Sequence, residues 1–217
     1  MYLDFSEIPS GDDFENFSKI FLENIGYRIL VKPAVGRDGG RDIIAEQPGN
    51  FGVGGYRWLV SCQHFSRSGR SVGIKDDEAN INKLKEHNCH GFMFLYSTNY
   101  TEDLRASIER ACEYARCDYF IFNGHDIAHR MLSSPHQYPL IQQYLPETHQ
   151  RLVGAIGSGV NCCEYADDME GFYLFYTKND LTNQIEVMTL GQCCIASYAN
   201  HYDENRLPYG CAFVPRA

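Results

Sequence analysis

Apolar residues recur at helical spacing near the start of the chain. Intervals of three or four residues place them on one face of a helix. The residues are Phe14, Phe17, Phe21 and Ile25. Ser10 precedes this run with the spacing of a capping box, and Gly26 follows it. The pattern therefore predicts an amphipathic helix that begins after Ser10 and ends at Gly26.

Short apolar runs bounded by glycine and proline predict strands after this helix. Residues 27–31, 42–46 and 57–65 form the first three runs. The continuous apolar run 91–96 is typical of a strand buried on both faces, and 118–122 predicts another short buried strand. The strands before residue 66 lie close together in the chain, so we expect a meander against the first helix.

Two helical patterns separate the last three predicted strands. In the first, Asp76 or Asp77 is expected to cap a helix that ends near His87. In the second, Thr101 is expected to cap a helix. Its apolar positions are Leu104, Ile108, Cys112 and Ala115. A further short helix is predicted at 125–132, and the alternation of helix and strand implies parallel crossovers in a mixed sheet.

The composition changes after residue 153. Glycines are followed by β-prone runs at 172–177, 184–190 and 193–198. We therefore expect an α/β fold: a mixed β-sheet flanked by helices in a domain of residues 1–153, and a small β-rich C-terminal appendage of residues 154–217. An appendage of this size is marginal as an independent fold. We expect it to pack on the first domain, or to serve as the surface for a homodimer or a partner protein.

The composition is that of a globular protein without a membrane segment. The chain has 217 residues, of which 44% are hydrophobic, and it contains no apolar run near the roughly 20 residues that span a bilayer. The acidic start, with Asp4 and Glu7, lacks the basic residues of a secretion signal. Nine cysteines without a C-x-x-C pair favour reduced thiols. We expect a soluble cytoplasmic protein that does not bind membranes.

The charge is distributed unevenly. The net charge of −9 argues against a nucleic-acid partner, but eight basic and only three acidic residues lie between Arg28 and Lys75. A basic segment in an acidic protein can bind phosphate locally. The candidate nucleic-acid contacts are Arg37, Arg41, Arg67, Arg70 and Lys75.

Polar residues gather where two of the predicted strands meet. Ser61 and Gln63 alternate along one strand and so share a face. A hairpin through Gln47 and Tyr56 would set them opposite Asp42. This arrangement predicts a metal site of the kind found in small nucleases.

Six short motifs occur in order along residues 10–150. They are Phe14-Glu15, Gly26-Tyr27, Asp38-Gly39-Gly40-Arg41-Asp42, Ser61-Cys62-Gln63-His64-Phe65, Ser68-Gly69-Arg70-Ser71-Val72-Gly73 and Tyr96-Ser97-Thr98. With these motifs the chain resembles the Mrr-like restriction endonucleases of the PD-(D/E)xK nuclease superfamily over roughly residues 10–150. The resemblance implies a DNA endonuclease that hydrolyses phosphodiester bonds with Mg²⁺ or Mn²⁺ and acts in defence against foreign DNA.

The resemblance also implies the roles of the site residues. Asp42 would bind the metal, helped by the Cys62 main-chain carbonyl and by Glu15, while Ser61 stands at the second acidic position of the family. Gln63 stands at the position of the lysine that orients or activates the attacking water. Mg²⁺ prefers oxygen ligands and acidifies bound water, so these roles are chemically sound.

Two positions depart from the family pattern. Ser61 offers a neutral hydroxyl, and Gln63 carries no charge. Loss of a preorganised charged group at a transition state commonly costs about 10²-fold in rate, so the sequence predicts an impaired nuclease. The alternatives are a natural nucleic-acid-binding or protein-interaction module on a nuclease fold, and an active enzyme that carries an inactivating Lys→Gln change.

Ordinary structural roles compete with several of these assignments. Glu15 can be a first-turn carboxylate favoured by the helix dipole, and Arg67 and Arg70 can be surface charges. His64 follows Gln63 and faces the other side of the strand, where packing under a helix is expected. Glu78 is expected to be solvated.

Overall fold

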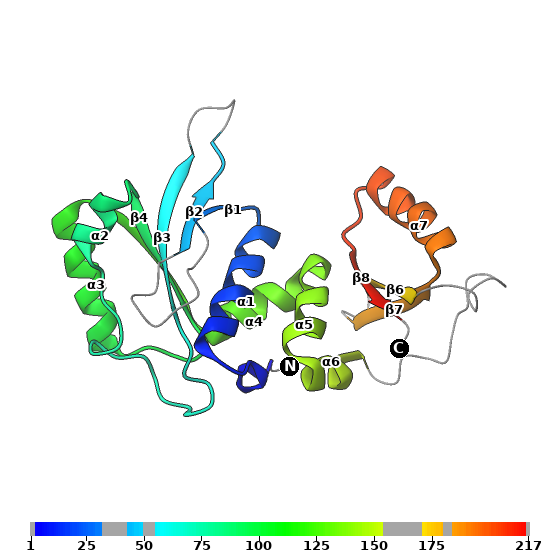
Figure 1. Ribbon diagram of the computed structural model, residues 1–217, viewed down its shortest axis with the longest axis horizontal. Coiled ribbons are helices and arrows are strands. Elements are labelled where there is room, and N and C mark those ends of the chain that lie inside the picture. The colour runs from blue at the N-terminus through cyan, green and yellow to red at the C-terminus, as the bar shows by residue number, and fades with distance from the viewer. Residues whose placement is uncertain (1–2, 32–42, 50–54, 154–170, 180–183, 216–217) are drawn as a thin grey trace. The chain divides into compact units, whose positions relative to one another are not determined.

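The computed structural model describes residues 3–31, 43–49, 55–153, 171–179 and 184–215 (Figure 1). The chain divides into two compact units, Met1–Ala128 and His129–Ala217. None of the described helices is both long and apolar enough to cross a membrane.

The predicted amphipathic helix is present as α1 (Gly11–Asn24), preceded by a short 3-10 turn, η1 (Phe5–Glu7). The Asp13 N–H donates to Ser10 Oγ over 3.1 Å, which caps the helix. Beyond the C-cap residue Ile25, Gly26 adopts φ +96°, which favours glycine and turns the chain into the first strand. The caps and the apolar period of this segment are thus confirmed.

The first unit contains a five-stranded mixed sheet. The strands lie in sequence order; the first three are antiparallel, and the last three are parallel. They are β1 (Arg28–Val31), β2 (Ile43–Gln47), β3 (Tyr56–Gln63), β4 (Gly91–Tyr96) and β5 (Asp118–Phe122). The predicted mixed sheet with parallel crossovers is therefore confirmed. The change of direction occurs at β3, which carries the predicted site.

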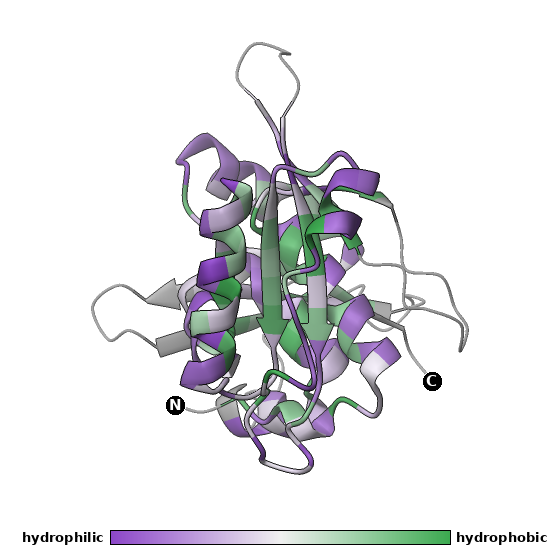
Figure 2. Cartoon of the chain, turned by 90° about the vertical axis from the view of Figure 1, so that its left-hand side faces the viewer, coloured by the Kyte–Doolittle hydropathy of each residue, from purple (hydrophilic) through white to green (hydrophobic). Residues whose placement is uncertain are grey.

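Helices cover both faces of this sheet. Helix α1 lies on one face, and α2 (Ile81–Glu86) and α3 (Glu102–Ala115) lie on the other (Figure 1). All six residues of β4 are buried, as predicted. On the α2 and α3 side the core contains Leu59, Leu84, Phe92, Phe94 and Ile108. The helices turn hydrophobic positions towards the sheet and polar positions outwards (Figure 2).

Two predictions in this unit are wrong. Helix α2 is capped by Asn80, which accepts from the N–H groups of Asn82 and Lys83, because Asp76 and Asp77 are engaged elsewhere. Strand β5 is not fully buried, since Phe120 is 51% exposed. As the last strand of the sheet, β5 has a neighbour on only one side.

The second unit contains a three-stranded antiparallel sheet with the order β7-β6-β8. Its strands are β6 (Gly171–Asn179), β7 (Gln184–Leu190) and β8 (Gly210–Pro215). The helical elements from the end of the first unit onwards are α4 (Gly124–Ser133), η3 (Pro135–Gln137), α5 (Tyr138–Tyr144), α6 (Pro146–Val153) and α7 (Gln192–Glu204). The predicted small C-terminal sheet is present. The strand predicted at 193–198 is wrong, because those residues lie in α7.

Two neighbouring residues of β6 contact helices on opposite faces of the small sheet. Phe175 contacts Tyr198 and Tyr202 of α7, whereas Tyr176 contacts Tyr138 and His149, from α5 and α6. Successive residues of a strand face opposite sides, so helices cover both faces of the small sheet. Helices α5 and α6 therefore belong to the second unit. The predicted division at residues 153 and 154 falls inside that unit, and it stays a prediction.

Candidate active site

A pocket of about 290 Å³ lies beside the end of β3. It gathers side chains from α1, from β3, from the segment before α2 and from α2 itself. The polar lining residues are Glu15, Ser61, Gln63, Asp77, Glu78, Asn80 and Lys83, together with Cys62. The apolar residues that line it include Leu59, Phe92 and Phe94. The structure therefore brings together four residues that the sequence placed in the site: Glu15, Ser61, Cys62 and Gln63.

The hairpin between β2 and β3 has the expected register. Ile43 pairs with Val60, and Gln47 pairs with Tyr56. Ile43 follows Asp42 in the chain, and Val60 precedes Ser61. Asp42, Arg37 and Arg41 themselves lie outside the described residues.

Ser61 binds a carboxylate instead of replacing one. Its hydroxyl donates to Asp77 Oδ1 over 3.1 Å, and the Tyr96 hydroxyl donates to Asp77 Oδ2 over 3.1 Å. Tyr96 is buried on β4. Burial first, and then the charge of Asp77, raise the pKa of Tyr96 above its usual value, so its hydroxyl keeps its proton and remains a donor. Two hydroxyls thus orient the Asp77 carboxylate at the pocket.

Lys83 is the basic side chain among the described residues of the pocket lining. Its backbone N–H donates to Asn80 Oδ1 over 3.2 Å, which fixes the first turn of α2. The next residue, Leu84, is buried in the core and anchors the helix to the sheet. Lys83 is therefore held at the same pocket as Gln63, although it comes from a different element.

The predicted DNA-contacting arginines of the loop after β3 have structural partners. Arg70 forms a two-pronged ion pair with Asp76, with N to O distances of 2.7 and 2.9 Å, and stacks over Phe65. The Arg70 guanidinium, followed by the Gly73 N–H, lowers the pKa of Asp76 to about 2. Arg67 Nε donates to the Ser6 carbonyl over 3.4 Å.

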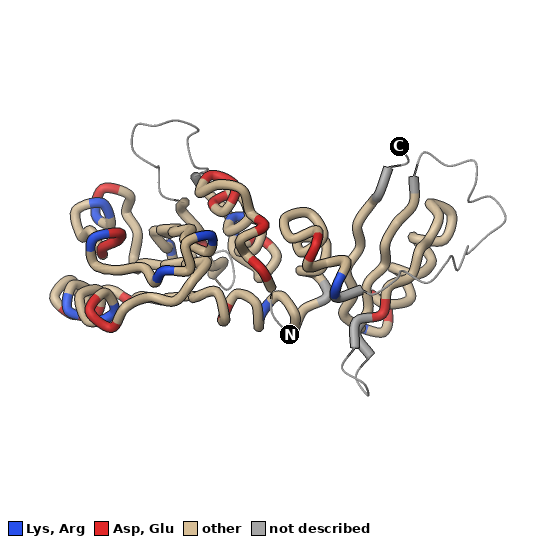
Figure 3. Tube along the Cα trace, turned by 90° about the horizontal axis from the view of Figure 1, so that it is seen from below, with Lys and Arg blue, Asp and Glu red and all other residues tan. Residues whose placement is uncertain are grey.

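Lys75 is exposed, and acidic and basic residues are interspersed over the first unit (Figure 3). The predicted positive segment is partly neutralised: Arg28 and Arg57 both pair with Glu46, over 2.5 and 3.6 Å.

His64 is packed and not part of the pocket. Its ring stacks on Phe14 with centroids 5.1 Å apart, and its Nε2 lies 3.0 Å from the Ile8 carbonyl. A carbonyl only accepts, so Nε2 carries the proton. Burial lowers the pKa of His64 below its usual value. The expectation that this histidine packs under a helix is confirmed.

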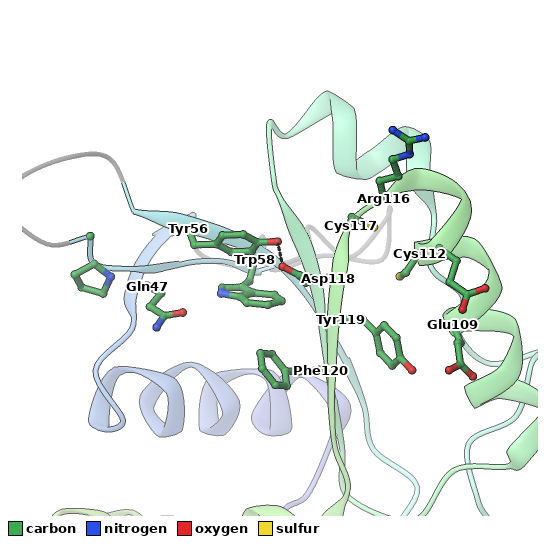
Figure 4. Close-up of a pocket in the computed structure, with 13 residues that line it drawn as sticks. Gln47, Tyr56, Trp58, Glu109, Cys112, Arg116, Cys117, Asp118, Tyr119 and Phe120 are labelled. Atoms are coloured by element: carbon green, nitrogen blue, oxygen red, sulfur yellow. Dashed lines mark hydrogen bonds between the residues drawn. The ribbon is translucent and has the colours of Figure 1, made fainter.

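A second pocket, of about 880 Å³, lies at the other end of the same strands. Tyr56, Trp58 and Phe120 lie on one side of β5, and Tyr119 faces α3 on the other (Figure 4). The Tyr56 hydroxyl donates to Asp118 Oδ2 over 2.7 Å. This pocket is larger than the one at Ser61, and its charged lining residues are Glu109, Glu113, Arg116 and Asp118, of which Asp118 accepts from the Tyr56 hydroxyl.

The smaller pocket has the donor chemistry that a hard divalent cation prefers. Glu15 and Asp77 offer carboxylate oxygens, and Ser61 offers a hydroxyl. Among the described residues no group of three or more His, Cys, Asp or Glu side chains is arranged to hold a metal ion. The described residues therefore offer oxygen donors at this pocket, and the predicted metal ligand Asp42 lies outside them.

Sequence reasoning missed Asp77 and Lys83. The sequence pattern offers Asp76 or Asp77 as a helix cap and gives Lys83 no role. Asp77 lies 16 residues from Ser61 in the chain. The signal in the sequence was that positions 61 and 63 carry no charged side chain. An active site of this family would then need its charged groups from other elements.

Comparison with known proteins agrees with this geometry. The family model of the Mrr catalytic domain, described as a restriction endonuclease, matches residues 8–130, more than half of the chain. No curated protein and no solved structure matches the chain significantly. The matched segment contains the mixed sheet, α1 and every residue of the smaller pocket. The chain belongs to the Mrr family of restriction endonucleases, and its first unit is a nuclease domain that acts on DNA.

Proposed function

We propose that this chain hydrolyses phosphodiester bonds of DNA in a reaction that depends on Mg²⁺ or Mn²⁺, and that it serves in defence against foreign DNA. The observation that carries the proposal is the convergence of Glu15, Ser61, Cys62 and Gln63 on one pocket beside β3. These residues come from two elements, α1 and β3, and the positions that the resemblance to the family implies for them in a nuclease site support the proposal.

In this reaction water adds to phosphorus, and the bond from phosphorus to one deoxyribose oxygen breaks. That oxygen takes a proton, so the products are a phosphate end and a hydroxyl end. Glu15 and Asp42 would hold the metal through carboxylate oxygens, with the Cys62 carbonyl beside them. The metal would supply an acidified water and positive charge next to the phosphate.

We propose that five basic residues contact the phosphates of the DNA backbone: Arg67, Arg70 and Lys75, together with Arg37 and Arg41. Arg67, Arg70 and Lys75 are exposed. Arg70 is already held by Asp76, so it would present a fixed guanidinium edge. Contacts of this kind set the position of DNA without reading its sequence.

The test is cleavage of supercoiled plasmid DNA by the full chain with and without Mg²⁺. Asp42→Ala is expected to lower the rate at least about 10²-fold, because it removes a charged group at the transition state. The control is Asp103→Ala, an exposed first-turn residue of α3. Cleavage by Asp42→Ala at the wild-type rate would remove Asp42 from the site.

A second candidate function is binding of DNA without cleavage. The neutral pair Ser61 and Gln63 favours it, because neither side chain supplies the charge that the family places there. Under this alternative the wild-type chain binds DNA but leaves it intact with either metal, and Gln63→Lys creates cleavage.

A further inference from the structure

Strand β3 lacks two charges that a nuclease of this family carries. Ser61 and Gln63 share one face of the strand and both line the smaller pocket. The pocket nevertheless contains charged groups, and they come from outside β3. Two of these charged groups, Asp77 and Lys83, are candidates for the acid absent at position 61 and the lysine absent at position 63.

Asp77 lies where an acid at position 61 would place its charge. The Ser61 hydroxyl donates directly to Asp77 Oδ1 over 3.1 Å. The Glu78 N–H donates to the same oxygen over 2.9 Å, and Tyr96 donates to Oδ2 over 3.1 Å. Three donors from two strands and a loop thus hold one carboxylate against the serine.

The adjacent aspartate shows what a purely structural role looks like. Asp76 is held by both guanidinium nitrogens of Arg70 and by the Gly73 N–H, and it does not line the pocket. Asp77 lines the pocket and accepts from the Ser61 and Tyr96 hydroxyls and from the Glu78 N–H. The two neighbours therefore have different surroundings, and of the two Asp77 is the one at the pocket.

Lys83 supplies positive charge to the pocket that Gln63 lines without a charge. The Asn80 cap and the buried Leu84 fix the backbone on either side of it. Lys85, two residues further along α2, is exposed and does not line the pocket. The two lysines of this helix thus form a matched pair for a test.

We propose that Asp77 and Lys83 supply the carboxylate and the ammonium that β3 lacks, with Asp77 facing the metal and Lys83 facing the scissile phosphate. This inference rests on the proposed nuclease function and names further residues for it. An ammonium near the phosphate stabilises the negative charge that grows during hydrolysis. The site would be complete, but two of its charges would come from the segment that crosses from β3 to β4.

The first experiment removes the lysine at position 83 and then places a lysine at position 63. Lys83→Gln is expected to lower plasmid cleavage by about 10²-fold, whereas Lys85→Gln changes it by no more than about twofold, as for an exposed charge outside the site. The double variant Gln63→Lys with Lys83→Gln places an ammonium group on β3 instead of α2. Its cleavage rate is expected to lie within about 10-fold of the wild-type rate. Equal rates for the two single variants, or no recovery in the double variant, would overturn the role of Lys83.

The second experiment measures metal binding by calorimetry with Mn²⁺ and without DNA. Asp77→Asn keeps the shape but removes the charge, and it is expected to weaken binding at least about 10-fold. Ser61→Glu in the Asp77→Asn background is expected to restore binding. Asp118→Asn in the other pocket is the control. An unchanged affinity in Asp77→Asn, or no measurable binding by the wild-type chain, would overturn the role of Asp77.

A third measurement separates this inference from the proposed hydrolysis. If the wild-type chain cleaves no DNA with Mg²⁺ or Mn²⁺, the hydrolytic function fails. Lys83 is then tested by DNA affinity in Ca²⁺. Lys83→Gln should bind more weakly than Lys85→Gln and show a smaller salt dependence. Equal affinities of the two variants would remove Lys83 from the phosphate as well.

Discussion

The two ends of the sheet in the first unit carry very different pockets. At the start of β3 and β5, Tyr56, Trp58 and Phe120 line a space of about 880 Å³ with Asp118 at its edge. At the end of β3, a space of only about 290 Å³ collects polar side chains from four parts of the chain. The smaller pocket is the candidate active site. Both pockets have charged lining residues, so the smaller one is identified by the residues that the family resemblance assigns to a site, Glu15 and Ser61 to Gln63, and not by its volume or charge.

The position of the smaller pocket has a structural reason. Ser61, Cys62 and Gln63, which line it, are the last three residues of β3, and β3 is the strand at which the sheet changes from antiparallel to parallel. Ligands of α/β sheets bind beyond the carboxyl ends of strands, where the connections diverge. At the opposite end the strands begin, and the chain packs closely at Gly91, where a Cβ would lie 2.7 Å from the Asp118 carbonyl and 2.8 Å from Trp58.

The comparison predicts that the aromatic end of the sheet is structural. Trp58 is 3% exposed and packs against Tyr56 and Phe120 with ring centroids 4.6 and 5.1 Å away. Trp58→Ala should lower the free energy of unfolding by about 3–5 kcal/mol, as measured by urea denaturation. Trp58→Phe keeps a ring and should cost less. A loss below about 1 kcal/mol in Trp58→Ala would show that this end is not part of the core.

The carboxylates of the two pockets should differ in their effect on catalysis. Glu15→Gln is expected to lower plasmid cleavage by about 10²-fold, equivalent to about 2.7 kcal/mol of transition-state stabilisation. Asp118→Asn should leave the cleavage rate close to that of the wild type, because Asp118 is bound by the Tyr56 hydroxyl away from the site. A lower cleavage rate in Asp118→Asn than in Glu15→Gln would contradict the assignment of the active site to the smaller pocket. Thermal unfolding of both variants controls for loss of fold.

The smallest expected effect concerns His64, which packs between the site strand and α1. Burial lowers the pKa of His64 in the folded state below the value of about 6.5 that a histidine has in an unfolded chain. As the pH falls below about 6.5, the unfolded chain therefore binds more protons at His64 than the folded chain does. Stability should therefore be complete above that pH and decrease as the pH falls through the lower folded pKa. His64→Gln should show a smaller drop in melting temperature between pH 7.5 and pH 5. His149, whose pKa burial also lowers, is present in both proteins and cancels.

Local patterns allowed much of the first unit to be predicted. The apolar period of α1, the Thr101 cap of α3 and the fully buried β4 depend on neighbouring residues and could be read without a fold. The cap of α2 could not, because Asp76, Asp77 and Asn80 all suit a cap. Asn80 takes this position since Arg70 holds Asp76 and two hydroxyls hold Asp77.

The helix α7 shows the same limit in the second unit. The run 193–198 is rich in β-prone residues and was predicted as a strand. In the structure Tyr198 and Tyr202 lie one helical turn apart and both contact Phe175 of β6. Packing against a strand outweighs the weak local preference of this segment.

The sequence by itself determined the scaffold and the empty positions of the site. Strand alternation placed Ser61 and Gln63 on one face, and their side chains revealed that positions 61 and 63 carry neither an acid nor a cation. Only the tertiary structure decided what lies beside them. Asp77 and Lys83 reach the pocket because the segment after β3 returns across the sheet and α2 is anchored by Leu84. Spacing along a chain predicts faces of single elements, whereas proximity between elements depends on how they pack.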